Sequence, residues 1–207
     1  MNEETNEKLR AIKQSFRRMM SGPTSQSLRD KGAIYKLNWG VPMPQLKELA
    51  HEYGKDMDLA IQLWKEDIRE CKIMATMIMP PDCMSRELAG IWIEQTTSQE
   101  MAEIAAFNLY QYMNEAPALA YEWIASDRPM SQIAGFQVLS RLFMRNIHPD
   151  ERGINELMDQ ALIALQGEHL GVRHAAATCL TRLADLGDEY EILVRKATKP
   201  LHLDFFD

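Results

Sequence analysis

Apolar residues recur along the chain at the three- and four-residue spacing of amphipathic helices. In residues 3–20, Leu9, Ile12, Phe16 and Met19 fall on one side of a helix. Similar stripes follow, separated by Pro, Gly or a capping Ser, Thr or Asp. No segment alternates apolar and polar residues, as a half-buried strand would, over more than a few positions. The predicted fold class is therefore all-α.

The boundaries of the predicted helices come from these stripes and their end signals. Residues 24–35 are predicted as a loop or a single turn after the break at Ser21-Gly22-Pro23. Asp82 and the Thr97–Glu100 capping box are predicted to start two of the later helices. Besides the first, the predicted helices span residues 42–53, 56–64, 68–79, 82–92, 97–112, 116–125, 126–143, 149–166, 172–186 and about ten residues after Gly187.

Alanine-rich helix centres recur at Ala75, Ala105, Ala134 and Ala176, which are 30, 29 and 42 residues apart. These periods are near those of helix-pair repeats, about 30–47 residues. Small residues at helix centres let neighbouring helices approach closely. We therefore expect antiparallel helix pairs stacked into a curved superhelix, an α-solenoid, and a single domain over residues 1–207, because no linker divides the chain.

The segment from residue 30 to 80 also resembles a known family. It contains a Gly40-Val41 turn, then Pro44, Lys47 and Ala50, then Leu63-Trp64 and the run Glu70-x-Lys72-x-x-Ala75. This order resembles the DNA alkylation repair proteins, which are HEAT-like helical-repeat DNA glycosylases. The resemblance implies a superhelix that binds duplex DNA in its concave face and releases N-alkylated purines.

Three further family motifs should carry the working groups, and this chain departs from each. The aromatic of the first motif falls on Ser98 or Gln99, and its carboxylate on Ala102 or Glu103. The two phosphate-anchoring arginines of the second motif fall on Ser131 and Gln132. The aromatic of the third motif is Thr178. Glu103 is the one candidate catalytic residue that remains, because a carboxylate can stabilise positive charge on the sugar.

The charge of −7 is unevenly distributed along the chain. Residues 1–55 hold ten Lys or Arg against six Asp or Glu, whereas residues 56–128 hold five against thirteen. Phosphate binding requires several cations along one track. The candidate nucleic-acid-binding residues are Arg10, Lys13, Arg17, Lys36, Lys47, Arg141, Arg145 and Arg173.

Other chemistries have no pattern in the sequence. The five histidines form no HExxH motif, no metal-binding spacing is present, and no glycine-rich phosphate loop occurs, so we expect neither a metal nor a cofactor. Cys71, Cys83 and Cys179 are predicted to be free thiols. The chain shows no signal peptide and no membrane-spanning stretch, so we expect a cytoplasmic protein.

Two functional hypotheses follow. The first is a divergent DNA alkylation repair-like HEAT-repeat protein that binds double-stranded DNA weakly through its basic N-terminal patch and has lost the glycosylase residues. The alternative is a non-catalytic helical-repeat scaffold that binds a basic protein or peptide in its concave face. Met-rich helices suit adaptable contacts, and the acidic middle of the chain suits a basic partner.

Overall fold

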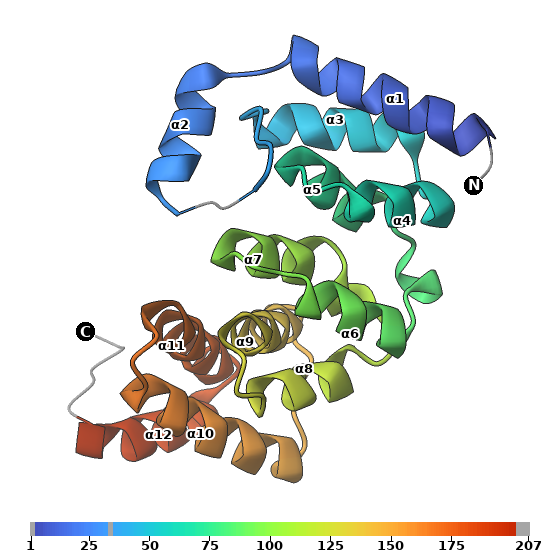
Figure 1. The fold of residues 1–207 in the computed structure, drawn as a ribbon. Coiled ribbons are helices and arrows are strands. Elements are labelled where there is room, and N and C mark those ends of the chain that lie inside the picture. The colour runs from blue at the N-terminus through green and yellow to red at the C-terminus, as the bar shows by residue number, and fades with distance from the viewer. Residues whose placement is uncertain (1–2, 33–34, 202–207) are drawn as a thin grey trace. The chain divides into compact units, whose positions relative to one another are not determined.

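The computed structural model describes residues 3–32 and 35–201, and these residues are helical with short connections (Figure 1). They contain no strand, and Leu37 and Ile68 form an isolated bridge. The all-α prediction is confirmed. In the described residues the α-helices are α1 Glu3–Arg18, α2 Gly22–Asp30, α3 Met43–Tyr53, α4 Met57–Lys65, α5 Arg69–Ile78, α6 Arg86–Glu94, α7 Gln99–Asn108, α8 Ala116–Ile124, α9 Pro129–Met144, α10 Glu151–Gln166, α11 Leu170–Ala184 and α12 Asp188–Thr198. The 3₁₀ turns are η1 Pro81–Cys83, η2 Tyr110–Tyr112 and η3 Lys199–Leu201.

The chain divides into two compact units. Unit 1 spans Met1–Leu109 and unit 2 spans Tyr110–Asp207. Each unit is described by itself below. The expectation of a single domain over residues 1–207 stays a prediction.

Helix α5 forms the centre of unit 1. It packs against α3, α4 and α7, and α1 packs on α4. Eight of its ten residues are buried, including both members of the charged pair Arg69 and Glu70. Its neighbour α4 begins where the Asp56 carboxylate accepts a hydrogen bond from the Leu59 N–H at 3.0 Å. The preceding helix α3 ends at Gly54, whose φ of 67° favours glycine. These signals place both helix boundaries close to the predicted ones.

The segment predicted as a loop or a single turn, residues 24–35, holds most of the nine-residue helix α2, and its residues 33 and 34 lie outside the described residues. The Ser21 hydroxyl caps it by accepting from the Thr24 N–H, and Pro23 lies in its first turn, where the missing N–H costs nothing. Ser25 then donates a hydrogen bond to the Asn38 carbonyl at 2.7 Å. The prediction was wrong because α2 has little apolar periodicity and is held by polar contacts to residues outside it.

Two predicted helix starts were also displaced. Pro80 and Pro81 lead into a 3₁₀ turn, so α6 starts after Ser85, whose hydroxyl accepts from the Leu88 N–H at 3.2 Å. The cap of α7 is Ser98 rather than Thr97, because Ser98 accepts from the Met101 N–H and also bonds the Tyr35 hydroxyl at 2.8 Å.

Tryptophans pack the outer helices of unit 1. The rings of Trp64 and Trp92 stack with centroids 4.1 Å apart and planes 1° apart. The Trp64 indole donates to the Gln95 side chain at 2.8 Å, and the Lys72 ammonium lies 4.6 Å from the Trp64 ring centroid. The Leu-Trp and Lys72 positions of the family pattern therefore serve packing. Trp64, Trp92 and Trp123 are buried in the core.

Helix α9 forms the centre of unit 2, between α8 and α11. Ala134 on α9 and Ala176 on α11 are both fully buried. Gly135 lets α9 approach α8, because a Cβ there would overlap the Ala120 carbonyl and the Ile124 backbone and side chain. Helix α10 packs on α8, α11 and α12.

Candidate nucleic-acid interface

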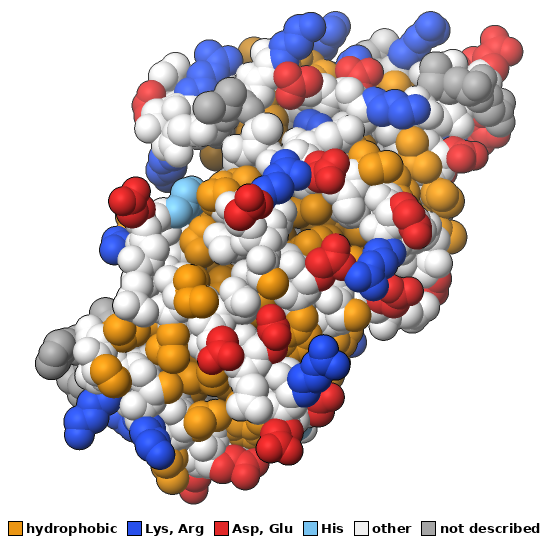
Figure 2. Space-filling model, turned by 60° about the horizontal axis from the view of Figure 1, so that its bottom comes forward, with side chains coloured by type: hydrophobic (Ala, Val, Ile, Leu, Met, Phe, Trp, Pro, Cys, Tyr) orange, Lys and Arg blue, Asp and Glu red, His pale blue; other side chains and the backbone are white. Residues whose placement is uncertain are grey.

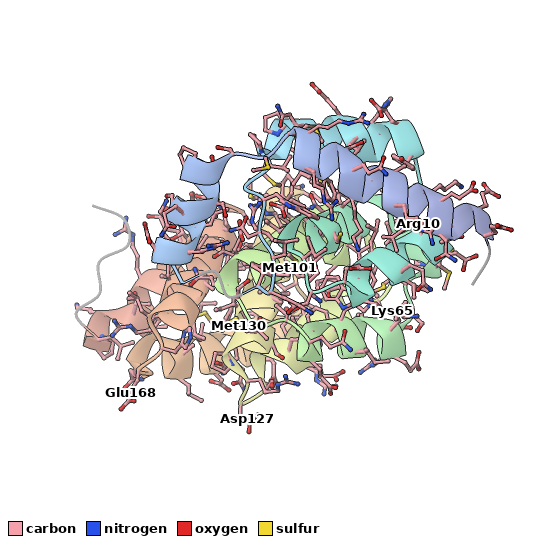
Figure 3. The ribbon with its side chains drawn as sticks, turned by 45° about the horizontal axis from the view of Figure 1, so that its top comes forward. Arg10, Lys65, Met101, Asp127, Met130 and Glu168 are labelled. Atoms are coloured by element: carbon pink, nitrogen blue, oxygen red, sulfur yellow. The ribbon has the colours of Figure 1, made fainter. Side chains whose placement is uncertain are left out.

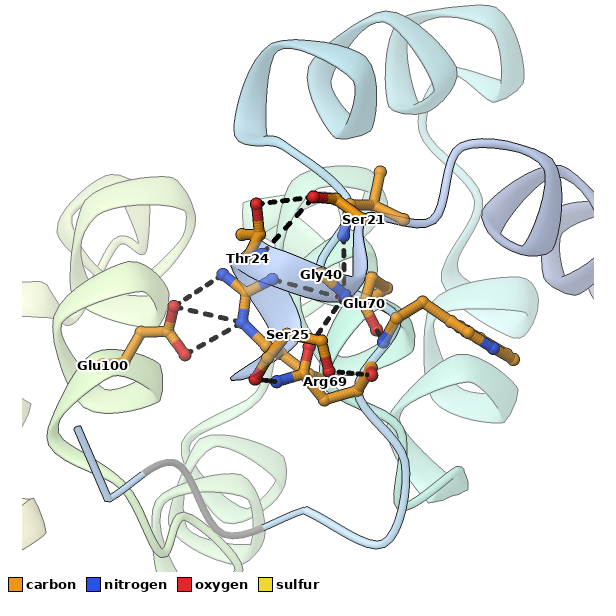
Figure 4. Close-up of polar contacts among 10 residues, drawn as sticks. Ser21, Thr24, Ser25, Gly40, Arg69, Glu70 and Glu100 are labelled. Carbon is orange, nitrogen blue, oxygen red and sulfur yellow. Dashed lines mark hydrogen bonds and ion pairs between the residues drawn. The ribbon is translucent and has the colours of Figure 1, made fainter. Parts of the chain in front are cut away.

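The Gly-Val turn of the family pattern is held by the buried carboxylate of Glu70. Its two oxygens accept hydrogen bonds from the N–H groups of Trp39, Gly40 and Val41 at 2.9–3.2 Å (Figure 4). Gly40 has a φ of 71°, and a Cβ on it would overlap the backbone of Ser21 and Ser25. The turn and the start of α5 therefore form one polar unit, which carries no group available for catalysis.

A second buried charge connects α5 to α7. The Arg69 guanidinium is 4% exposed and donates to both oxygens of Glu100 at 2.6–3.1 Å (Figure 4). Burial alone would lower the pKa of Arg69, but the hydrogen bonds and charge of Glu100 and the charge of Glu70 raise it. The guanidinium thus stays charged and fixes α7 against α5.

A groove of about 460 Å³ runs along the outer flank of α1. Figure 3 shows Arg10 on the side of α1 next to α4. Three of the predicted DNA-binding cations line this groove, spaced so that they share one helix face. The lining residues are Asn6, Leu9, Arg10, Lys13, Gln14, Arg17 and Glu66. The structure therefore brings Arg10, Lys13 and Arg17 together, beside amide side chains that can donate hydrogen bonds.

One carboxylate enters this basic groove. Glu66, at the end of α4, pairs with the Lys13 ammonium at 3.0 Å, and both side chains are about 30% exposed. Lys8, also on α1, pairs with Glu4 and Asp56 and does not line the groove. Part of the positive charge of α1 is thus neutralised within unit 1, whereas Arg10 and Arg17 extend into solvent.

The remaining candidate cations of unit 1, Lys36 and Lys47, lie on its exposed surface. Figure 2 shows Lys and Arg side chains gathered along the edge of unit 1 that contains α1. Lys36 and Lys47 are exposed. Lys36 lies in the segment before the Gly-Val turn, and the Lys47 ammonium lies 5.9 Å from the ring centroid of Phe107.

The candidate cations of unit 2 each have a different environment. Arg145 donates to the Gln111 carbonyl at 2.8 Å and lies 5.2 Å from the Tyr112 ring centroid. Arg141 contacts the sulfur of Met144, and Arg173 is exposed on α11.

The first family motif lies at the start of α7. Ser98 is the buried cap and Gln99 donates to Glu103 at 2.8 Å, while Ala102 is buried. Glu103 is partly exposed on the solvent face of α7. Of the four motif positions, only Glu103 carries a carboxylate, and no aromatic side chain stands at the family's aromatic position.

The other two motifs lie in unit 2. Ser131 is buried in the first turn of α9 and Gln132 is partly exposed next to it. Thr178 is partly exposed on α11. These short neutral side chains offer hydrogen bonds but neither charge nor a π face.

Sequence reasoning missed two side chains near the candidate residues. Nothing in the sequence singles out Glu66, and only its contact across to α1 reveals its effect on Lys13. Phe107 falls within the helix predicted for residues 97–112, and its side chain is 41% exposed. A helical wheel could have found it, since Phe107 shares a face with Glu100 and Glu103.

Two further observations bear on the type of site. Among residues 3–32 and 35–201, no group of three His, Cys, Asp or Glu side chains is placed to hold a metal ion. In the same residues, no helix is long and apolar enough to cross a membrane.

Comparison with known proteins supports the fold and the family resemblance. The sequence profile of a family described as DNA alkylation repair enzyme matches residues 12–196. A solved structure is similar over 92% of this chain and 82% of its own, with a TM-score of 0.84 and 18% identity. It is described as a member of a new family related to the HEAT-like repeat DNA glycosylases, with affinity for branched DNA structures. The HEAT-like fold is therefore confirmed. No curated protein matches the chain.

Proposed function

Because the chain belongs to the DNA alkylation repair enzyme family, we propose that it binds DNA through the groove of α1 without excising alkylated bases. The observation that carries this proposal is the convergence of Arg10, Lys13 and Arg17 on one groove. Arginine forks bind phosphate oxygens through paired hydrogen bonds, and the amides of Asn6 and Gln14 add donors beside them.

The spacing of the cations suits a phosphate backbone. Arg10 and Arg17 are seven residues apart, so their Cα atoms are separated by about 10 Å along the helix. Lys13 lies between them, held by Glu66. Such contacts carry no sequence information, so binding should be independent of sequence and steeply dependent on salt.

The absence of base excision rests on the three family motifs. The positions for the two aromatics are polar, and the positions for the two arginines are Ser131 and Gln132. A cationic base or sugar would find no π face at those positions and only Glu103 as a carboxylate. We therefore infer that the scaffold of a glycosylase serves here for binding.

The structurally similar protein suggests the kind of DNA. That protein has affinity for branched DNA structures. A binding mode that reads phosphates rather than base sequence is compatible with junctions as well as duplexes, so we extend the proposal to branched DNA.

Charge reversal tests the proposal. Binding of labelled duplex and four-way junction DNA should be measured by fluorescence anisotropy over a range of salt concentrations. The Arg10→Glu/Arg17→Glu variant should weaken binding to both and flatten the salt dependence by about 0.9 per lost phosphate contact. The matched control is Arg152→Glu, an exposed arginine on α10. Equal effects of the two variants would contradict the placement on α1. A folded wild type that binds no DNA would favour the alternative, a scaffold for a basic protein or peptide.

A further inference from the structure

The solvent face of α7 ends in an exposed aromatic ring. Glu100, Glu103 and Phe107 lie at spacings of three and four residues, on the side opposite the buried Met101, Ala102, Ala105 and Ala106. Glu100 is held by Arg69. Phe107 is 41% exposed in the last turn of the helix, where its neighbour Asn108 donates to Thr76 at 2.9 Å. The ring is thus presented to solvent on an anchored helix end.

A cation from another helix of unit 1 lies against this ring. The Lys47 ammonium, on α3, is 5.9 Å from the Phe107 centroid, within the range of a cation–π contact. Helix α5, which packs against both α3 and α7, is almost entirely buried. Side chains from α3 and α7 therefore meet over α5 and form a small surface with a π face and a flexible positive charge.

We propose that the Phe107–Lys47 surface binds an unpaired nucleotide of branched DNA, with the base stacked on the Phe107 ring and its phosphate held by Lys47. This inference rests on the proposed DNA-binding function and deepens it. Stacking on an aromatic side chain requires an exposed base face, which a continuous duplex does not present. The lysine has four rotatable bonds, so its ammonium can leave the ring for a phosphate one nucleotide away. Phe107 would therefore distinguish branched DNA from plain duplex.

Glu103 determines how a bound nucleotide is oriented on this surface. Its carboxylate lies one helical turn before Phe107 and is fixed by the Gln99 amide at 2.8 Å. A phosphate would be repelled on the Glu103 side and attracted on the Lys47 side. The backbone of the bound nucleotide should hence pass along α3, with the base edge toward Glu103, where a carboxylate can accept from an exocyclic amine.

A fluorescent base analogue tests the inference directly. The probes are a duplex with a single-stranded flap carrying 2-aminopurine at its first unpaired position, and the corresponding duplex without a flap. Stacking on Phe107 should quench the analogue when wild-type protein binds. Phe107→Ala should abolish the quenching and weaken flap binding roughly 5- to 150-fold, the value of one base stack, while duplex binding is unchanged. Phe107→Trp should restore both the quenching and the affinity for the flap.

The controls separate this inference from the proposed function. Ile91→Ala removes an exposed apolar side chain from α6, 49% exposed, and should change neither readout. Lys47→Ala should flatten the salt dependence of flap binding by about 0.7, the value for one phosphate contact to a single strand. If wild-type protein binds flap and duplex through Arg10 and Arg17, yet Phe107→Ala leaves their affinity ratio unchanged, this inference is overturned and the proposed function stands. If wild-type protein binds neither probe, both are overturned.

Discussion

The carboxylate of Glu70 accepts a hydrogen bond from the N–H of Gly40 at 2.9 Å, across thirty residues of sequence. The same carboxylate accepts from Trp39 and Val41, so it satisfies three consecutive backbone donors in a segment outside any helix. The strongest part of the family pattern, the Gly-Val turn and the glutamate of α5, is therefore one structural contact. The stability of the turn therefore accounts for these residues without any role in chemistry.

Replacement of Glu70 should destabilise unit 1 strongly. Glu70→Ala removes the acceptor of the Trp39 and Val41 N–H groups and the negative charge beside the buried Arg69, and we expect a loss of about 3–5 kcal/mol in the free energy of unfolding. Glu70→Gln keeps one acceptor oxygen and should cost less. Urea unfolding followed by circular dichroism measures both variants. Equal stability of Glu70→Ala and wild type would show that the carboxylate does not hold the turn.

The buried alanines of unit 2 should not tolerate larger side chains. Ala134→Leu or Ala176→Leu forces neighbouring helices apart and should cost about 1–3 kcal/mol. The exposed Ala118 on α8 is the matched control, since Ala118→Leu should change stability by less than about 0.5 kcal/mol. Melting temperatures of the three variants compare them directly, and an unchanged melting temperature for both core variants would show that these alanines have room beside them.

Neutralising Glu66 should strengthen DNA binding. Glu66→Gln removes the partner of Lys13, so one more cation becomes available to phosphate and the log–log salt slope should steepen by about 0.9. Asp56→Asn removes the same charge beside Lys8, which lies outside the groove, and retains an oxygen to cap α4. Its effect on DNA affinity should be smaller. An equal gain in both variants would mean that net charge, rather than Lys13, controls affinity.

The protein should not release alkylated purines. Loss of one electrostatic stabiliser commonly lowers an enzymatic rate by about 10²–10³-fold, and several of the family's groups are replaced together here. Purified protein incubated with methylated duplex should release no more 7-methylguanine or 3-methyladenine than a sample without protein. Release above that level that disappears in Glu103→Gln would instead assign catalysis to Glu103.

Tyr35 should make the fold sensitive to alkaline pH. Burial raises the pKa of its phenol to about 12, with the charge of Glu100 adding to the shift and the Ser98 hydrogen bond opposing it. The unfolded chain releases this proton near pH 10, so the contribution of Tyr35 to stability is complete below pH 10 and is lost as pH rises toward 12. Ultraviolet titration of the phenolate absorbance should show one fewer tyrosine with a raised pKa in Tyr35→Phe. The free energy of unfolding of this variant should depend less on pH between 10 and 12.

The helices could be predicted from the sequence wherever an apolar stripe and a capping residue agreed. Helix α4, between Asp56 and the charged residues after Trp64, is one example. Helix α2 was missed because its stability comes from Ser25 and Asn38, which are polar and thirteen residues apart. The Thr97 cap was misplaced by one residue because Tyr35, sixty-three residues away, holds Ser98 instead.

The candidate site was predictable only where its residues share one helix. Arg10, Lys13 and Arg17 follow from helical spacing alone. Glu66 and Lys47 act on partners in other helices, and periodicity says nothing about which helix lies beside which. Phe107 differs, because its helical spacing from Glu100 and Glu103 indicates a solvent face even though an aromatic residue in a helix is usually buried.

The stacked indoles of Trp64 and Trp92 have a spectroscopic consequence. Two parallel rings 4.1 Å apart are close enough for their electronic transitions to couple, and this coupling is lost once α4 and α6 separate. Of the four tryptophans in the sequence, Trp123 alone belongs to unit 2, where the ring of Tyr110 meets it edge-on. Each unit thereby contains its own optical reporter, and the order in which the two halves of the chain lose structure can be read from unlabelled protein.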